Sequence, residues 1–545
     1  MTSLAQLECD GDGRFPTVAA RRSDAATFGG VAPLPAFDAR RRAAVARLGD
    51  RPDNLTGVTP TEVRAAIGRA WALLLRRRAR EAQAVASRLE LRLGDLPSAE
   101  AGAVAAELSV IRAAVCVHSG HERAALSQAA LLARHPPGPV ARIAGAVGRL
   151  AAWRLGDLEA FYAVPVLPAL EAPDRAALAA TMLDRALDAA VELQQLRLPA
   201  ADRLAQDALD LARRPRAFRP AAAFAAALRA QVTYEAGDLE GARGLLREHL
   251  AVIRTGASPE AAIIAYPMLA RIATYGAQGE LAALLLREGE QLGERTACPG
   301  LTAACLRQRL EILLAEGRHE DAQATLERLD RLAASPAAAG PEHAFEASLV
   351  LARASFALAR APRGEDVAAI RRLHHQAIAR QDLNAALQLS LRMVHGLTRI
   401  GQETAAGALL VECLDLALGA GLFQTILDSG EGVRERLEAL FDSASAPGSP
   451  TRHLAPYAAS LIRHWDAADA GRRGLKGALR SKGPLTQRER DILRLFSRGL
   501  SNKHVALHLR ITAETVKSHA KNIFVKLAAQ TRVEAVSRAE SLGLI

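Results

Sequence analysis

The sequence predicts an all-α protein, in which a superhelix of helical hairpins precedes a small domain of four short helices. Three observations support this fold class. Ala and Leu dominate the 545 residues, aromatic side chains make up only 4%, and strand-like runs of Val, Ile, Thr and Tyr are nearly absent. Breaks centred on glycine recur at a regular interval. The last 60 or so residues carry helix-capping signals around short amphipathic segments.

The length predicts more than one domain, because a single core usually stops growing well below 545 residues. With 50% hydrophobic and 24% charged residues, the composition is that of a folded protein. We expect an unassigned N-terminal extension over 1–56, tetratricopeptide-like helical repeats over 57–441, a linker with one short helix over 442–483 and a C-terminal domain over 484–545. The extension has little periodicity before Phe37–Leu48, and we assign it no function.

Five glycine-centred breaks indicate the repeat. They lie at Gly120, Gly156, Gly237, Gly317 and Gly401, which are 36, 81, 80 and 84 residues apart. These intervals are one or two periods of roughly 40 residues. An Ala follows each Gly after four or five residues. Glycine permits a tight turn, and the small Ala lets the second helix approach the first closely.

The repeating unit is expected to be a helical hairpin, which is clearest around Gly237. A hairpin cannot bury both of its faces alone, so we expect the units to stack into a superhelix with a concave surface. The apolar positions that define this unit are Phe224, Leu228 and Val232 before the turn, and Leu239, Ala242, Leu246 and Leu250 after it.

Capping signals predict the helices of the C-terminal domain. A capping box at Thr486–Glu489 opens a helix that Gly499 ends, Ser501 opens a short second helix, and Thr512 caps a third that runs to Leu527. A fourth follows from Thr531. The apolar residues expected to form one core are Ile492, Leu493, Leu495 and Phe496; Val505, Ala506 and Leu509; Val516, Ala520, Ile523 and Leu527; and Ala535, Val536, Ala539 and Leu542 before Gly543.

The third of these helices has a polar side that carries Glu514, Lys517, Ser518 and Lys521. Lys517 and Lys521 are four residues apart, an unfavourable like-charge pair, so we expect their partner to be an anion outside the helix, such as DNA. Residues 472–545 hold 16 Lys or Arg against 5 Asp or Glu, which leaves 54 basic and 54 acidic residues in 1–471. The whole net charge of +11 is therefore C-terminal, as in a protein that binds a phosphate backbone.

These C-terminal residues resemble the DNA-binding domain of LuxR-type bacterial transcription regulators. One departure is His504, which stands where the family usually has Glu, on the supporting helix of the helix-turn-helix. The resemblance rests on Leu485-Thr486, Arg488-Glu489, Gly499-Leu500-Ser501-Asn502-Lys503, Ile511-Thr512, Thr515-Val516-Lys517-Ser518-His519, Lys526-Leu527, Arg532, Ala535-Val536 and Leu542-Gly543-Leu544.

The resemblance implies a cytoplasmic bacterial transcription regulator that inserts the Thr512 helix into the major groove of double-stranded DNA as a homodimer. Lys517, Ser518 and Lys521 are expected at base edges, and contact of Lys517 or Lys521 with phosphate alone is the alternative. Lys503, Thr512, Thr515 and Asn522 are expected to position the DNA backbone. Effector binding by the repeats is expected, and RNA polymerase is a further candidate partner. The alternative function is an interaction scaffold whose DNA-binding end is vestigial or binds without sequence preference.

A second resemblance links the repeats to those of large MalT-like regulators. It rests on the segments Trp71–Ala82 and Gly421–Gly430. Those regulators carry an ATPase module ahead of the repeats, but no G-x-x-x-x-G-K-[ST] motif occurs in these 545 residues. The alternating strands and helices of a receiver domain are not predicted either. We therefore expect neither that nucleotide switch nor any cofactor.

Catalytic and metal chemistry find little support in the sequence. Cys116, His118 and His121 resemble a metal cluster, but they span a helix end and a turn and have no fourth ligand nearby. His374 and His375 are expected on a helix surface, and no catalytic triad can be assembled. We expect no enzyme, no metal site and no disulfide framework. Apolar stretches are interrupted by Arg or Glu, so we expect no membrane span.

A linker is predicted between the repeats and the C-terminal domain. Residues 443–456 are rich in Ser, Ala, Pro and Gly, and Tyr457–Trp465 has the pattern of a short helix. The basic stretch Gly471–Pro484 is expected to be a flexible tether. Whether its Lys and Arg touch phosphate or are simply solvated stays open.

Overall fold

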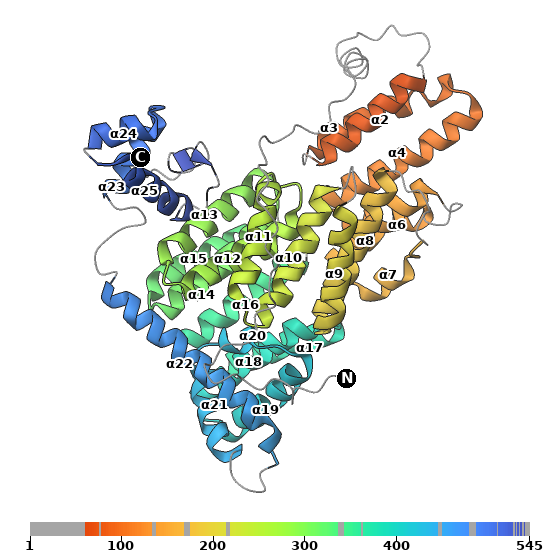
Figure 1. Ribbon diagram of the computed structural model, residues 1–545. Coiled ribbons are helices and arrows are strands. Elements are labelled where there is room, and N and C mark those ends of the chain that lie inside the picture. Colours follow the sequence, from red (N-terminus) through yellow and green to blue (C-terminus); the bar gives the residue numbers. More distant parts are fainter. Residues whose placement is uncertain are drawn as a thin grey trace. The chain divides into compact units, whose positions relative to one another are not determined.

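In the computed structural model, the prediction of an all-α fold is confirmed, since the described residues form helices and turns without a strand (Figure 1). The structure describes residues 60–75, 78–132, 138–167, 175–213, 218–335, 343–360, 363–444, 450–478, 487–509, 511–526, 529, 531–532, 535–536 and 539. The N-terminal extension lies outside these ranges.

The helices of the N-terminal half and middle of the described chain pair into successive hairpins. Their bounds are α2 Pro60–Leu75, α3 Ala79–Glu90, α4 Ser98–His118, α5 Glu122–Leu132, α6 Pro139–Leu155, α7 Leu158–Ala163, α8 Arg175–Gln194, α9 Leu198–Ala212, α10 Arg219–Glu235, α11 Leu239–Arg254, α12 Pro259–Tyr275, α13 Gly279–Arg295, α14 Pro299–Ala315, α15 His319–Ala333, α16 His343–Arg360, α17 Gly364–Ala379, α18 Leu383–Arg399 and α19 Glu403–Ala420. Three more helices of this region and three of the C-terminal domain follow below.

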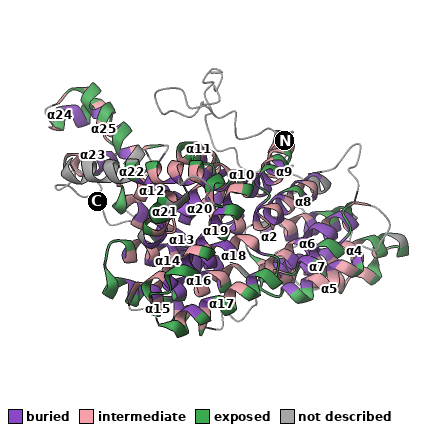
Figure 2. Ribbon diagram, turned by 90° about the horizontal axis from the view of Figure 1, so that it is seen from below, coloured by how far each residue is buried: buried purple, intermediate pink, exposed green. Residues whose placement is uncertain are grey.

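Even-numbered helices from α2 to α18 form one continuous row, in which each helix touches the next. Most odd-numbered helices pack against this row, each between two successive members. The row curves, because α6 reaches α16 and α8 reaches α18. Buried residues lie where these helices face one another, as Figure 2 shows. This is the stacked arrangement that a hairpin with two apolar faces requires.

The turns between helices explain the interval of the repeat. All five predicted glycines have left-handed backbones, with φ from +67° at Gly156 to +84° at Gly237. Two of the three doubled intervals contain a further left-handed turn near the middle, at Leu196 (φ +59°) and at Ala277 (φ +53°). These two residues lie about midway between the flanking glycines, so the period near 40 continues without glycine. Non-glycine residues pay a steric cost in this conformation.

Aspartate caps the helix that follows several of these turns. The carboxylate of Asp157 accepts the backbone N–H of Ala160 at 2.9 Å, and Asp238 accepts that of Gly241 at 2.8 Å. Asp382 caps α18 in the same way. The Asp thus satisfies one of the N–H groups that a helix start leaves free, which fixes where the second helix of the hairpin begins.

Three helices after α19 complete this region. They are α20 Gln424–Leu427, α21 Glu431–Ala444 and α22 Ala455–Ala478. One apolar cluster continues from α6 through α14 and includes residues of α18 to α22. The prediction of a short helix over Tyr457–Trp465 was too short, because α22 runs on through Gly471 and Gly474. Ala and Arg favour helix strongly enough to carry two glycines.

Membrane and metal signatures are weak in the described residues. Glu100–His118 of α4 is long and apolar enough to span a membrane by length and composition, but 39% of it is buried in the fold. The core helix of a soluble protein can have the same length and apolar composition. The imidazole of His118 lies 2.8 Å from the carbonyl of Ala114 on its own helix.

The left-handed turns give a direct test of backbone strain. Ala277→Gly should raise the free energy of unfolding by up to about 1 kcal/mol, because glycine removes the Cβ clash at φ +53°. Gly317→Ala should lower it by a similar amount, since φ there is +73° and an added Cβ meets no neighbour within 4 Å. Urea titration of both variants measures the effects. If both substitutions raise the free energy of unfolding, or both lower it, this explanation of the turns is contradicted.

A buried carboxyl group on α10 predicts a pH effect. Burial raises the pKa of Glu235 to about 7, against hydrogen bonds from Thr425 that favour its ionised form. The charge of Asp428 also raises this pKa, and the charge of Arg271 lowers it. Because the folded protein holds this proton more tightly than the unfolded chain, the stabilisation is complete below about pH 4.5 and is lost as pH rises through about 7.

Glu235→Gln should remove that part of the pH dependence. The difference in unfolding free energy between wild type and variant should shift by about 3 kcal/mol between pH 4.5 and pH 8, in favour of the variant at the higher pH. Asp184, whose pKa burial raises to about 6 against the charge of Arg149, is present in both proteins and cancels in this difference. If the unfolding free energies of wild type and variant instead change with pH in parallel, the pKa of Glu235 is the same in the folded and unfolded states.

Candidate nucleic-acid interface

The first helix of the C-terminal domain, α23 Gln487–Ser497, begins and ends close to its predicted limits. Ile492, Leu493 and Phe496 are buried. Gly499 has a φ of +79°, and the N–H of Leu500 reaches back to the carbonyl of Leu495 at 3.3 Å. This is the glycine-dependent helix end that the sequence predicted. Thr486 lies outside the described residues, so its capping box stays a prediction.

Ser501 caps the second helix, α24 Asn502–Leu509, as predicted. The N–H of His504 donates to the Ser501 hydroxyl at 3.4 Å, and the Nδ1 atom of His504 lies 2.9 Å from the same oxygen. His504 therefore contacts the cap from the third helical position, where a capping box usually has Glu or Gln. The departure from the expected residue changes a contact at the helix start and leaves the helix intact.

Thr512 opens the third helix, α25 Ala513–Lys526. Its hydroxyl accepts the N–H of Thr515 at 3.1 Å, and the two threonine hydroxyls lie 2.7 Å apart. Thr512 is the cap of this helix, as predicted, and Leu527 lies outside the described residues. Both threonines are exposed, so the start of α25 is open to solvent.

The exposed side of α25 carries the residues that the sequence assigned to base contacts. Lys517, Ser518, Lys521 and the neighbouring Asn522 are exposed. Val516, Ala520 and Ile523, on the other side of this helix, are buried. One side of α25 therefore presents a row of hydrogen-bonding groups to solvent, and the other side packs into the core and fixes the position of the helix.

The prediction that the anionic partner of Lys517 lies outside its helix does not hold for the protein without DNA. Its ammonium group lies 2.9 Å from the carboxylate of Glu514, one turn earlier. Both side chains are largely exposed, at 62% and 81%, so the pair contributes little to stability and is easily exchanged. Spacing could have revealed it, since residues three apart are neighbours on a helix.

Two arginines hold the helices of this domain together at their C-terminal ends. Arg532 donates to the carbonyls of Phe496 and Leu500, and its guanidinium lies 4.1 Å from the centre of the Phe496 ring. Arg488 donates to the carbonyl of Leu509 at the end of α24. Helix ends leave carbonyls free, and arginine satisfies them. Sequence analysis gave neither residue this role, because the acceptors lie 21 to 36 residues away.

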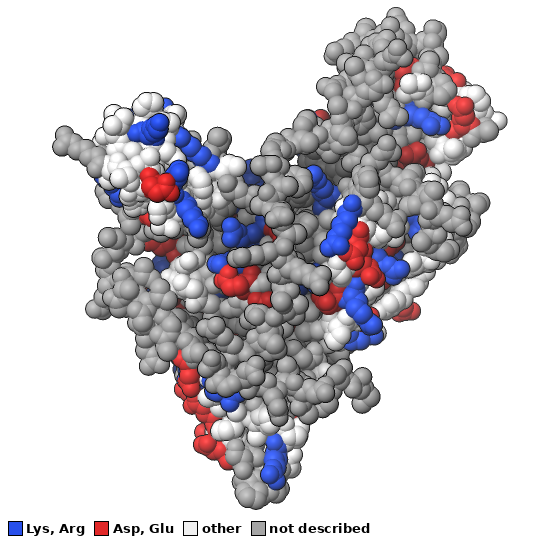
Figure 3. Space-filling model, in the orientation of Figure 1, with Lys and Arg blue, Asp and Glu red and all other residues white. Residues whose placement is uncertain are grey.

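The core formed by these helices closes on itself. It contains buried residues of α23, α24 and α25 and also Ala535 and Ala539. The described face of the domain is rich in Lys and Arg (Figure 3). Closure of the core and exposure of α25 together mean that the polar row can be presented to a partner without unfolding any part of the domain.

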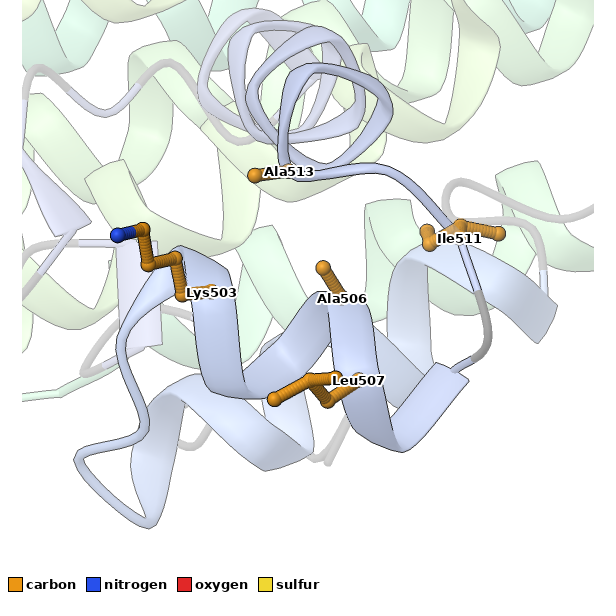
Figure 4. A pocket seen from close by; sticks show the side chains of 5 residues that line it. All are labelled: Lys503, Ala506, Leu507, Ile511 and Ala513. Atoms are coloured by element: carbon orange, nitrogen blue, oxygen red, sulfur yellow. The ribbon is translucent and has the colours of Figure 1, made fainter.

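Lys503 lies apart from the α25 row, on α24, at the edge of an open hollow. Figure 4 shows the other residues that line this hollow: Ala506 and Leu507 of the same helix, Ile511 of the following turn and Ala513 at the start of α25. Leu507 is 75% exposed.

Comparison with known proteins identifies the domain. Residues 483–539 match the family described as bacterial regulatory proteins, luxR family. Candidate HTH-type transcriptional regulators from Mycobacterium bovis and Mycobacterium tuberculosis are each 41% identical over 76 residues, which are 14% of this chain and 9% of theirs.

A longer similarity extends to the HTH-type transcriptional regulator MalT of Serratia proteamaculans, at 29% identity over 171 residues, which are 30% of this chain and 19% of MalT. The similarity to each of these relatives thus spans less than a fifth of the relative's length. The family match coincides with the closed core and the exposed row of α25. The C-terminal part of the chain, residues 483–539, is a LuxR-type helix-turn-helix DNA-binding domain.

Proposed function

We propose that this protein is a sequence-specific DNA-binding transcriptional regulator, and that its helical repeats bind an effector that controls it. The observation that carries the proposal is the exposed row Lys517, Ser518, Lys521 and Asn522 on a helix whose other side closes a core. An α-helix of this kind fits the major groove of DNA, where base edges differ in their donors and acceptors. The luxR family match supports the same reading.

The contacts divide between bases and backbone. Lys517, Ser518 and Lys521 face the base edges, whereas Thr512, Thr515, Lys503 and Asn522 position the phosphate backbone. The Thr512 hydroxyl accepts one N–H group at the start of α25, that of Thr515. The other N–H groups of this exposed first turn, with the helix dipole, are the donors that we propose for a phosphate. Lys517 exchanges Glu514 for a base or phosphate when DNA is bound.

A single domain of this size binds a short site weakly, so the functional unit on DNA is a homodimer that reads two half-sites. RNA polymerase is the partner through which a bound regulator acts on transcription. The polar groups of the repeats are where we expect the effector to bind. One cluster joins distant helices: the partly buried carboxylate of Glu311 accepts from Arg307 at 2.9 Å and from Arg392, 81 residues later, at 2.7 Å.

The division of contacts is tested by two substitutions. Lys517→Ala should cost about 1 to 3 kcal/mol on the specific duplex and relax preference at one position, because it removes a base contact. Lys503→Ala should weaken specific and scrambled duplexes alike and reduce the slope of log affinity against log salt by about one charge. Fluorescence anisotropy across several salt concentrations measures both.

A charge-matched control is Arg318→Ala, which removes one cation from an exposed turn of the repeats, where Arg318 pairs with Asp321. It should leave DNA binding unchanged. If Lys517→Ala weakens both duplexes equally while Lys503→Ala changes preference, then α24 lies closer to the bases than α25 and the proposed assignment is reversed. Equal binding of all duplexes by the unaltered protein would favour a scaffold without sequence preference.

A further inference from the structure

The short helix α20 forms the contact between distant parts of the chain that carries this inference. Its four residues, Gln424–Leu427, are all buried and lie between Gly421 (φ +73°) and Gly430 (φ +90°). α20 contacts α10, about 190 residues earlier, on one side and α22 on the other. Figures 1 and 2 both place it among the helices of the repeats. A four-residue helix cannot be stable alone, so these neighbours hold it.

On the repeat side, Asp428 receives donors from two helices. Its carboxylate accepts the hydroxyl of Tyr234 at 2.9 Å and a guanidinium N–H of Arg271 at 2.8 Å on one oxygen. The hydroxyl of Tyr275 donates to the other oxygen at 2.7 Å. Gln424 adds a fourth donor at 3.2 Å from within α20. Charge-assisted hydrogen bonds of this number make a strong and specific carboxylate site.

A second set of bonds joins the start of the same segment to α10. The carboxylate of Glu235 accepts the backbone N–H of Thr425 at 3.0 Å and its hydroxyl at 2.8 Å. The N–H of Phe423 donates to the backbone carbonyl of Glu235 at 2.9 Å. The backbone of α20 is thus bound, as well as its side chains, in the way a protein binds a peptide.

The other side of the segment is bound by α22. The indole N–H of Trp465 donates to the carbonyl of Leu427 at 3.1 Å, and the Tyr457 hydroxyl donates to the carbonyl of Leu422. Trp465 is buried. α22 also packs against α21, which contacts α18 and α19. The last described helix before the LuxR-type domain is therefore attached to the repeats by two routes, one of which runs through α20.

We propose that α20 is a latch: Tyr234, Arg271 and Tyr275 form a carboxylate-recognition site that Asp428 fills, and its release removes the attachment of α22 that runs through α20 and leaves α22 held through α21. Arg271 also lies within electrostatic reach of Glu311, so it keeps an anionic neighbour when Asp428 leaves. An effector that favours either state would shift the population in which α22 is detached from α20. That consequence for DNA binding rests on the proposed function; the latch itself does not.

Hydrogen exchange on the full-length protein tests the latch. Asp428→Asn keeps the size of the side chain and removes its charge, so amides of 421–430 and of 455–465 should both exchange roughly tenfold faster or more. Tyr275→Phe, which removes one donor, should act in the same direction with a smaller change. Amides of α13 and α15 should be unaffected, which shows that the variants are folded.

The matched control is Asp330→Asn, which removes an exposed carboxylate that also pairs with an arginine, Arg353. It should leave exchange in 421–430 and 455–465 unchanged. Faster exchange in 421–430 with α22 unchanged would overturn the latch, as would an equal response to Asp330→Asn. If the latch opens as expected but the unaltered protein binds no specific DNA, then the proposed function fails and the latch stands.

Discussion

The structure depends on one constraint, which is that a helical hairpin has two apolar faces and can bury only one of them by itself. Stacking meets this constraint, and it produces the continuous row of helices from α2 to α18, each touching the next. The last hairpin of a stack has an apolar face that no further hairpin covers. Here α20, α21 and α22 join the apolar cluster of the repeats, so the chain itself covers the last hairpins. The contacts that tie α20 to α10 follow from this need for cover.

The C-terminal domain meets the same constraint differently, because α23, α24 and α25 bury their apolar sides against one another and against Ala535 and Ala539. Among the described residues its core includes none from the repeats, and the polar side of α25 is left open. Arginine side chains donate hydrogen bonds to backbone carbonyls at two helix ends. Arg532 binds the end of α23, and Arg488 binds the end of α24. A domain that is complete by itself can bind DNA while the repeats change, which is what a regulator with a separate sensing region requires.

Features that depend on neighbouring residues could be predicted from the sequence, whereas contacts between residues far apart in the chain could not. Glycine turns, the Ser501 and Thr512 caps and the buried side of α25 depend on neighbours within a few residues, and all were predicted. The turn at Leu196 was not predicted, because packing forces an ordinary residue into a glycine-like backbone there. The Asp428 site joins residues about 150 to 190 positions apart, and no spacing rule reaches so far. The assignment of contacts to bases or phosphates remains a prediction.

The most direct test of the central claim, that this protein reads a DNA sequence through α25, is to map the fragments of its source genome that the purified full-length protein retains. Regulators discriminate their sites from random DNA by factors of about 10³ to 10⁷. The account predicts one recurrent motif among the retained fragments, which Lys517→Ala broadens at a single position. Retention of fragments without any shared motif would contradict it.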